Sequence, residues 1–278
     1  MNVLKRLLSL RHLLTGSTCK IISLLVILVT FFFVLLTVQE VWQPFSLHQL
    51  PDIHPSIPAG LPSKNFPDRK WLHRVDSIER VRYADTRYTG IEIDVSFDEE
   101  KQVFDVSHTF AISIGLSLDT LIAEITNSRQ HFYWIDFKNL TGDNKKAAVK
   151  ELYRIARKYD IVSNIIVESS NPRELDEFSY RGFYTSYYLP DIDPGHLSEE
   201  DMKAHIRNIA SHLSNSKVHA ISSNHKQYEI IKKYFSGYDI LLWNFTDNPL
   251  ARKLRENKLL KDPQVKVLLI EDTSHEYK

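Results

Sequence analysis

The sequence has 278 residues, of which 43% are hydrophobic and 25% charged, a composition typical of a folded globular protein and not of a disordered chain. The net charge is zero. The first 20 residues hold four of the 35 basic residues and no acidic one, so the rest carries 31 basic and 35 acidic residues, which argues against a protein that binds nucleic acid through its phosphates.

The first predicted element is an apolar helix over residues 21–38. This run contains 18 residues without a charge, and at about 1.5 Å per residue it would span about 27 Å, close to the hydrocarbon core of a bilayer. A cleaved signal peptide is the alternative, but the run is longer than usual for one and no small-x-small cleavage site follows it. We therefore predict a transmembrane signal anchor.

The charges around this helix predict its orientation. Residues 1–20 form a basic flank, and all the nearby positive charge precedes the apolar run. The predicted protein is therefore a single-pass membrane protein with a cytoplasmic N-terminus and an extracytoplasmic domain in a periplasmic, extracellular or lumenal space. Residues 39–68 contain six prolines and are predicted to form an extended linker.

Residues 69–278 are predicted to form one barrel domain. Eight short β-rich runs, starting at residues 70, 90, 132, 164, 182, 218, 239 and 265, mostly alternate with amphipathic helical windows. This alternation is typical of a parallel sheet, and the predicted fold class is α/β, a (βα)₈ TIM barrel. A doubly wound open sheet is the alternative, but it usually has a glycine-rich turn where this chain has HRVDSIER.

One strand interrupts the alternation. After GIEIDVSF the chain turns at DEEK and returns as QVFDVSH, a link too short for a parallel crossover. We therefore predict an antiparallel arm in which opposite residues have numbers that sum to about 200. This register brings His108 beside Glu92.

Carboxylates alternate along the predicted inner face of two strands. Glu92 and Asp94 share one face of their strand, as Asp136 and Lys138 do on the next. Buried charges of this kind need a cation or a hydrogen-bond network. The three carboxylates are a hard-ligand set, which predicts a divalent cation, Mg²⁺ or Ca²⁺. An ion pair between Asp136 and Lys138 is the structural alternative.

Other polar residues are predicted to lie at the same end of the barrel. His73 ends the first strand and Arg74 follows it. A divalent cation, two histidines and basic residues indicate phosphodiester chemistry, with one histidine removing a proton from the attacking hydroxyl and the other protonating the leaving oxygen. His73 could instead cap the strand. Glu168 could be a further ligand, a substrate contact or a solvated loop residue.

These motifs resemble the glycerophosphodiester phosphodiesterase superfamily of metal-dependent (βα)₈ barrels. The resemblance rests on HR at the first strand end, E-x-D at the second, the returning histidine and D-x-K at the next. GIEIDVSFD and IDFK are also similar to segments of the sphingomyelinase D and menorin-like branches, and WNFTDNP is similar to a segment that lines the family's pocket. The resemblance implies His73 and His108 as the acid/base pair and Glu92, Asp94 and Asp136 as metal ligands.

The resemblance also implies a substrate and a reaction. Arg74 and Lys138 would contact phosphate, Trp243 would pack against the alcohol group, and a neighbouring hydroxyl of the substrate would attack phosphorus. The expected substrates are glycerophosphodiesters or lysophospholipid-type molecules. The chain departs from the family pattern at HRV in place of HRG and lacks the P-E-N-T motif. A non-catalytic barrel that binds a phosphorylated ligand or a partner protein is therefore the alternative.

Overall fold

The computed structural model describes residues 16–42, 50–107, 113–244 and 248–272, and within the first helix it describes the side chains of residues 21–37. The chain divides into two units, one made of residues 1–44 and 246–255 and the other of residues 45–245 and 256–278. All the described strands belong to the second unit, which therefore contains the barrel.

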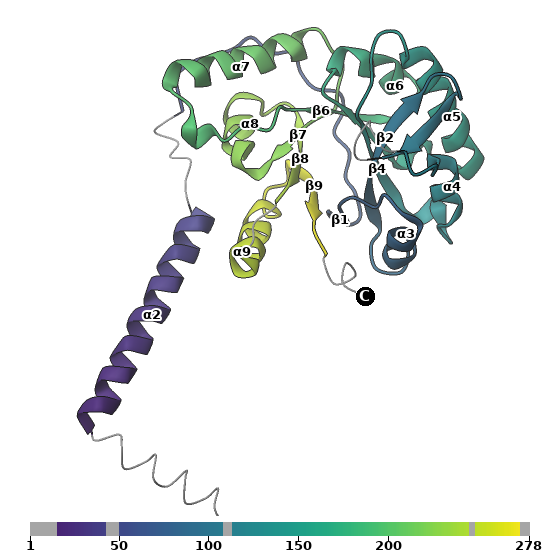
Figure 1. Ribbon diagram of the computed structural model, residues 1–278. Coiled ribbons are helices and arrows are strands. Elements are labelled where there is room, and N and C mark those ends of the chain that lie inside the picture. Colours follow the sequence, from purple (N-terminus) through teal and green to yellow (C-terminus); the bar gives the residue numbers. More distant parts are fainter. Residues whose placement is uncertain (1–15, 43–49, 108–112, 245–247, 273–278) are drawn as a thin grey trace, which may run out of the picture. The chain divides into compact units, whose positions relative to one another are not determined.

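The second unit is a closed barrel of parallel strands (Figure 1). Eight strands pair in the order β1, β2, β4, β5, β6, β7, β8 and β9, and β9 pairs with β1 to close the ring. The predicted (βα)₈ barrel is thereby confirmed. The strands span Lys70–Leu72 (β1), Gly90–Asp98 (β2), Val103–Val106 (β3), Phe132–Phe137 (β4), Ile165–Ser169 (β5), Tyr184–Tyr188 (β6), Ala220–Asn224 (β7), Asp239–Trp243 (β8) and Val265–Ile270 (β9).

The remaining strand, β3, is the predicted antiparallel arm. It pairs with the second half of β2, and opposite residues such as Val95 and Val106 have numbers that sum to 201, one more than predicted. β1 pairs with β2 only at Leu72 and Ile91, so β3 lies beside the part of β2 that β1 leaves uncovered. The backbone N–H of Ser107 donates to the carbonyl of Asp94 at 3.1 Å, which holds the end of the arm against β2.

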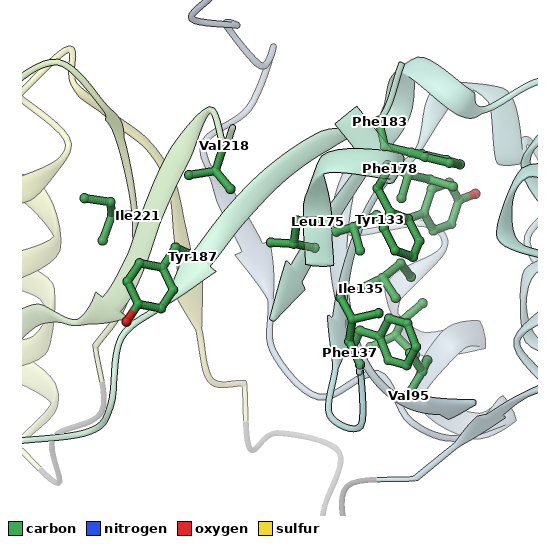
Figure 2. Packing of buried hydrophobic residues seen from close by; sticks show 14 of the residues in the cluster. Val95, Tyr133, Ile135, Phe137, Leu175, Phe178, Phe183, Tyr187, Val218 and Ile221 are labelled. Carbon is green, nitrogen blue, oxygen red and sulfur yellow. The ribbon is translucent and has the colours of Figure 1, made fainter. Parts of the chain in front are cut away.

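Most of the barrel strands separate an inner apolar cluster from an outer one. On β4, Trp134 belongs to the inner cluster, whereas Tyr133, Ile135 and Phe137 belong to the outer cluster, because successive side chains of a strand point to opposite faces. Figure 2 shows these outer residues gathered with Phe178, whose ring lies 6.1 Å from that of Phe137. The inner cluster fills the barrel, so the interior is a packed core and not a channel.

The helices α3 to α8 belong to the same unit as the barrel, whereas residues 249–255 of α9 belong to the first unit. Ser77, Ser117 and Ser198 cap α3, α4 and α7 by accepting a backbone N–H of the first turn. The α-helices span Ile78–Ala84 (α3), Leu118–Ala123 (α4), Lys145–Tyr159 (α5), Asp176–Tyr180 (α6), Glu199–Ser214 (α7), Tyr228–Tyr234 (α8) and Pro249–Leu259 (α9). The 3₁₀ turns span Ser128–Gln130, Val162–Asn164, Pro172–Leu175, Pro194–His196 and His225–Gln227.

Gly90 is the first residue of β2, and a larger residue at this position would collide with the inner cluster. A Cβ atom at this position would lie 2.2 Å from the indole of Trp71, far inside van der Waals contact. Trp71 is fully buried, and its Nε1–H donates to the carbonyl of Asp68 at 2.9 Å. The glycine therefore makes room for a tryptophan directly below the carboxylates of β2.

Residues 61–69, which we name the floor segment, contact the barrel at the N-terminal ends of its strands. The Ser63 hydroxyl donates to Asp239, the first residue of β8, at 2.8 Å, and the backbone N–H of Leu61 donates to Val218 at 3.0 Å. The ring of Phe66 packs at 5.6 Å against Tyr184, which starts β6. This part of the predicted linker therefore contacts the barrel and does not extend away from it.

The first unit contains the helix α2, Gly16–Trp42, which includes the predicted apolar span. Its large apolar side chains from Ile21 to Leu36 are exposed. In the part of the chain that the structure describes, no helix has both the length and the apolar character needed to cross a membrane. The membrane anchor over residues 21–38 therefore stays a prediction from the sequence.

Candidate active site

Three carboxylates meet near the C-terminal ends of β2 and β4. Glu92 and Asp94 are alternate residues of β2, and Asp136 is the register partner of Asp94 on β4, so all three side chains project from the inner face. One oxygen atom from each carboxylate lies within 4.8 Å of the other two. The structure therefore brings the three predicted metal ligands together.

This cluster contains an excess of buried negative charge. Burial, followed by the charges of Asp94 and Asp76, raises the pKa of Glu92 well above its ordinary value. Burial also raises the pKa of Asp136, to about 6, although the nearby Lys138 opposes the shift. Carboxylates that resist ionisation in this way are stabilised by a bound cation. Three hard oxygen donors in one cluster fit Mg²⁺ or Ca²⁺.

Lys138 lies within this cluster. Its Nζ atom is 2.6 Å from Oδ1 of Asp94 and also bonds to Oδ2 of Asp136. Its backbone N–H donates to the carbonyl of Val95 at 2.9 Å, which fixes the residue beside β2. Burial alone would lower the pKa of Lys138, but the charges of Asp136 and Asp94 outweigh burial and raise it. Lys138 is therefore a charged partner of two predicted metal ligands.

His73 lies beside the carboxylates, as the sequence predicted. Its Nε2 is 3.7 Å from Oε2 of Glu92, and its Nδ1 is 3.8 Å from Oε1 of Glu271, which follows β9. The backbone holds the residue in place, because its N–H donates to Ile270 at 3.1 Å and its carbonyl accepts from the Arg80 guanidinium at 2.9 Å. Burial lowers the pKa of His73 and so favours the neutral imidazole, which is able to accept a proton.

Arg74 contacts the site through its backbone. It has a φ of 54°, in the left-handed region that non-glycine residues seldom adopt. In this conformation its N–H donates to Oε2 of Glu92 at 2.7 Å, whereas its side chain is exposed. The turn therefore orients one of the predicted ligands, a role that the sequence did not predict.

Two further carboxylates of the site were missed in the sequence. Asp76 Oδ1 accepts the backbone N–H of Asp94 at 2.9 Å, and burial together with the charge of Asp94 raises the pKa of Asp76 to about 8. Glu271 lies beside His73. Glu271 directly follows the strand β9, so its place at a strand end could have marked it in the sequence. Asp76 lies in a loop, where no periodicity marks it.

Glu168 lies deeper than a loop residue would. It is 2% exposed, and its register partners are Asp136 on β4 and Ser186 on β6. Its Oε2 atom has no hydrogen-bond partner among the described residues. Burial and then the charge of Asp136 raise the pKa of Glu168 well above its ordinary value. The solvated-loop alternative is therefore excluded.

An aromatic pair lies at the same end of the barrel. Trp243, at the end of β8, stacks on Tyr188, at the end of β6, with ring centroids 5.2 Å apart and planes 10° from parallel. Burial, followed by the charges of Glu168 and Asp136, raises the pKa of Tyr188 to about 12, so this ring is close to the carboxylates. The sequence predicted Trp243 but not its partner.

The second predicted catalytic histidine, His108, lies outside the described residues. The last described residue before it is Ser107, which is bonded to Asp94. The arm therefore leads to the predicted site, and the role of His108 remains a prediction.

Comparison with known proteins identifies the fold. No protein-family model and no curated protein matches the sequence. A glycerophosphodiester phosphodiesterase from Parabacteroides distasonis superposes with a TM-score of 0.52 and 15% identity over 77% of this chain and 96% of that chain. A protein named as a glycerophosphoryl diester phosphodiesterase from Silicibacter pomeroyi gives 0.51 and 13% over 77% and 91%. One named as a glycerophosphodiester phosphodiesterase from Galdieria sulphuraria gives 0.50 and 12% over 74% and 95%. The implied resemblance is thus confirmed as a likeness of fold.

Proposed function

We propose that this protein is a metal-dependent phosphodiesterase that acts on glycerophosphodiesters or lysophospholipid-type molecules. The observation that carries the proposal is the meeting of three carboxylates, a lysine and a histidine at the C-terminal end of a (βα)₈ barrel, where enzymes of this fold place their active sites. The likeness to phosphodiesterases supports the choice of reaction class. Fold alone would not, because barrels support many reactions.

Glu92, Asp94 and Asp136 are the residues that would hold the divalent cation. When bound, the cation supplies positive charge that stabilises the negative charge developing on the phosphoryl oxygens. Asp76 and Arg74 are proposed to orient the ligands, Asp76 through the N–H of Asp94 and Arg74 by donating its own N–H to Glu92.

His73 and His108 are the proposed acid/base pair. A hydroxyl of the substrate next to the phosphodiester attacks phosphorus, and its proton passes to one histidine as the new O–P bond forms. The other histidine donates a proton to the leaving oxygen as the old P–O bond breaks. The products are an alcohol and a cyclic phosphodiester, whose opening by water returns both histidines to their starting states.

The remaining predicted residues are proposed to bind the substrate. Lys138 and the exposed side chain of Arg74 would contact phosphate oxygens. The stacked pair of Trp243 and Tyr188 offers an aromatic surface for the alcohol group. Glu168, buried beside Asp136, is the proposed contact for the group that reaches deepest.

We further propose that residues 21–38 anchor the protein in a membrane with the barrel outside the cytoplasm. The support is the uncharged run of 18 residues, its basic N-terminal flank and the exposed apolar side chains of α2. Resistance of the protein to extraction from membranes by alkaline carbonate tests the anchor. Protection of the barrel from protease added to the cytoplasmic side tests the orientation.

The experiment that tests the activity uses the full chain in detergent micelles. Glycerophosphocholine, glycerophosphoglycerol and lysophosphatidylcholine are supplied with Mg²⁺, Ca²⁺ or EDTA, and phosphorus NMR follows substrate, cyclic product and monoester. His73→Ala and His108→Ala are compared with His196→Ala, whose side chain is 86% exposed.

The proposal predicts cation-dependent turnover that both active-site variants lose and the control retains. Turnover that persists in EDTA would refute metal dependence. Cation binding without turnover of any diester would refute the enzyme and favour a barrel that binds a phosphorylated ligand.

A further inference from the structure

We propose that Lys138 is an exchangeable counter-ion, whose ammonium group competes with the divalent cation for Asp94 and Asp136 and turns toward the substrate phosphate when the cation binds. The inference rests on the proposed function, because it assumes the cation site. It adds that binding of the cation and binding of the phosphate strengthen each other, which the assignment of the metal ligands does not imply.

The first support is the position of the ammonium group. Nζ of Lys138 bonds to two of the three carboxylates whose oxygens lie within 4.8 Å of one another. Mg²⁺ or Ca²⁺ needs carboxylate oxygens at about 2.0–2.6 Å. A cation among these carboxylates would therefore lie close to the ammonium group, and the two positive charges would repel each other strongly in a buried site.

The second support is the freedom of the side chain compared with its backbone. The backbone N–H of Lys138 is bonded to Val95 at 2.9 Å, so the Cα atom stays in place. The side chain is 22% exposed, whereas that of Asp94 is 2% exposed. A lysine side chain has four rotatable methylene groups. The ammonium group is thus able to leave the carboxylates toward the open end without movement of the strand.

The third support is the balance of charge. The carboxylates of Glu92, Asp94 and Asp136 share one ammonium group, that of Lys138, which bonds to two of them. The positive charge of Lys138 stabilises these carboxylates as long as no divalent cation is bound, and a bound cation would take over this role. A permanent ion pair would instead keep both carboxylates from serving as full ligands.

The exchange has a consequence for binding. A phosphate anion attracts the ammonium group away from Asp94 and Asp136, so phosphate is expected to strengthen cation binding. By thermodynamic linkage, the cation strengthens phosphate binding by the same factor. Substrate and cation would therefore bind with positive cooperativity through one side chain.

Calorimetric titration of the full chain in detergent with Mg²⁺ tests the inference, without and with inorganic phosphate. Lys138→Met removes the charge and keeps the length, and Lys138→Gln serves as a second variant should the first not fold. The matched control is Lys145→Met, because Lys145 pairs with Glu174 at 2.7 Å and its side chain is 26% exposed. Thermal melting checks that each variant is folded.

We expect Lys138→Met to bind Mg²⁺ about 10-fold or more tightly than the wild type in the absence of phosphate. Phosphate should tighten Mg²⁺ binding in the wild type and in Lys145→Met, but much less in Lys138→Met. Equal or weaker binding by Lys138→Met, with the wild type still binding Mg²⁺, overturns the exchange and leaves the cation site standing. A wild type that binds neither Mg²⁺ nor Ca²⁺ overturns both the exchange and the metal-dependent function.

Discussion

Replacing Gly90 by alanine is expected to destabilise the barrel by about 3 kcal/mol, because the added methyl group displaces Trp71. The new Cβ atom would lie 2.2 Å from Cδ2 and 2.3 Å from Cε2 and Cγ of the indole. The indole has little room to retreat, since it is fully buried, bonds to Asp68 and lies 5.1 Å from the ring of Phe66 in an edge contact.

The magnitude follows from the contacts that a shift of Trp71 disturbs. Overpacking of a core costs about 1–3 kcal/mol. Loss of the hydrogen bond to Asp68 adds about 1 kcal/mol, and loss of the edge contact with Phe66 adds about 0.5–1 kcal/mol. Alanine reduces the entropy of the unfolded chain, which offsets about 0.5–1 kcal/mol. For a domain of this size a net loss of about 3 kcal/mol lowers the Tm by about 6–12 °C.

Tryptophan fluorescence during thermal unfolding measures the effect. Gly237→Ala is the control, because a Cβ atom at Gly237 has no neighbour within 4 Å. The double variant Gly90→Ala with Trp71→Phe should recover part of the lost stability, since the smaller ring leaves space for the methyl group. Equal Tm values for Gly90→Ala and Gly237→Ala would refute the packing argument.

Three further predictions test other parts of the molecule. Asp94→Ala should abolish cation binding in a calorimetric titration, and an unchanged titration would refute the site assignment. Phe66→Ala should lower the free energy of unfolding by about 3–5 kcal/mol in urea titrations, as expected for a large buried ring; a loss below 1 kcal/mol would mean that the floor segment is not part of the core. His219 should make stability depend on pH, because burial lowers its folded pKa from 6.5 to about 4. As the pH falls, the unfolded chain binds a proton at His219 before the folded chain does. The contribution of the neutral His219 to stability is therefore complete above pH 6.5 and is lost as the pH falls toward 4. After a discount for the partial exposure of the side chain, this contribution amounts to about 2 kcal/mol. His219→Asn should flatten this acid limb of the stability curve and His196→Asn should not, and equal slopes would contradict the assignment.

Alternation along the strands made the core of the site predictable from sequence. Residues two apart share a face, which placed Glu92 with Asp94 and Asp136 with Lys138. The short return after β2 predicted the antiparallel arm, although the register differs by one residue. Parallel pairing of β2 with β4 then placed these two pairs of residues side by side.

The sequence pattern did not predict how deeply residues are buried or which conformations the loops adopt. Periodicity gives the face of a strand but not the distance of a residue from solvent, so the burial of Glu168 was not predictable. Asp76 and the backbone of Arg74 act through turns, where the conformation depends on neighbours that are distant in sequence. The prolines of residues 39–68 predicted an extended linker, but residues 39–42 belong to α2, and composition does not reveal that Phe66 packs in the inner cluster.

The floor segment closes the barrel at the end where its strands begin. Phe66 and the bonds to Asp239 close the end where the strands begin, and the packed interior blocks any passage toward the carboxylates at the other end. Under the proposed function, a substrate would therefore reach the carboxylates from the end of the barrel where the strands finish. An approach from that one end would suit a molecule with a phosphodiester near one tip better than a long polymer with its diesters in mid-chain.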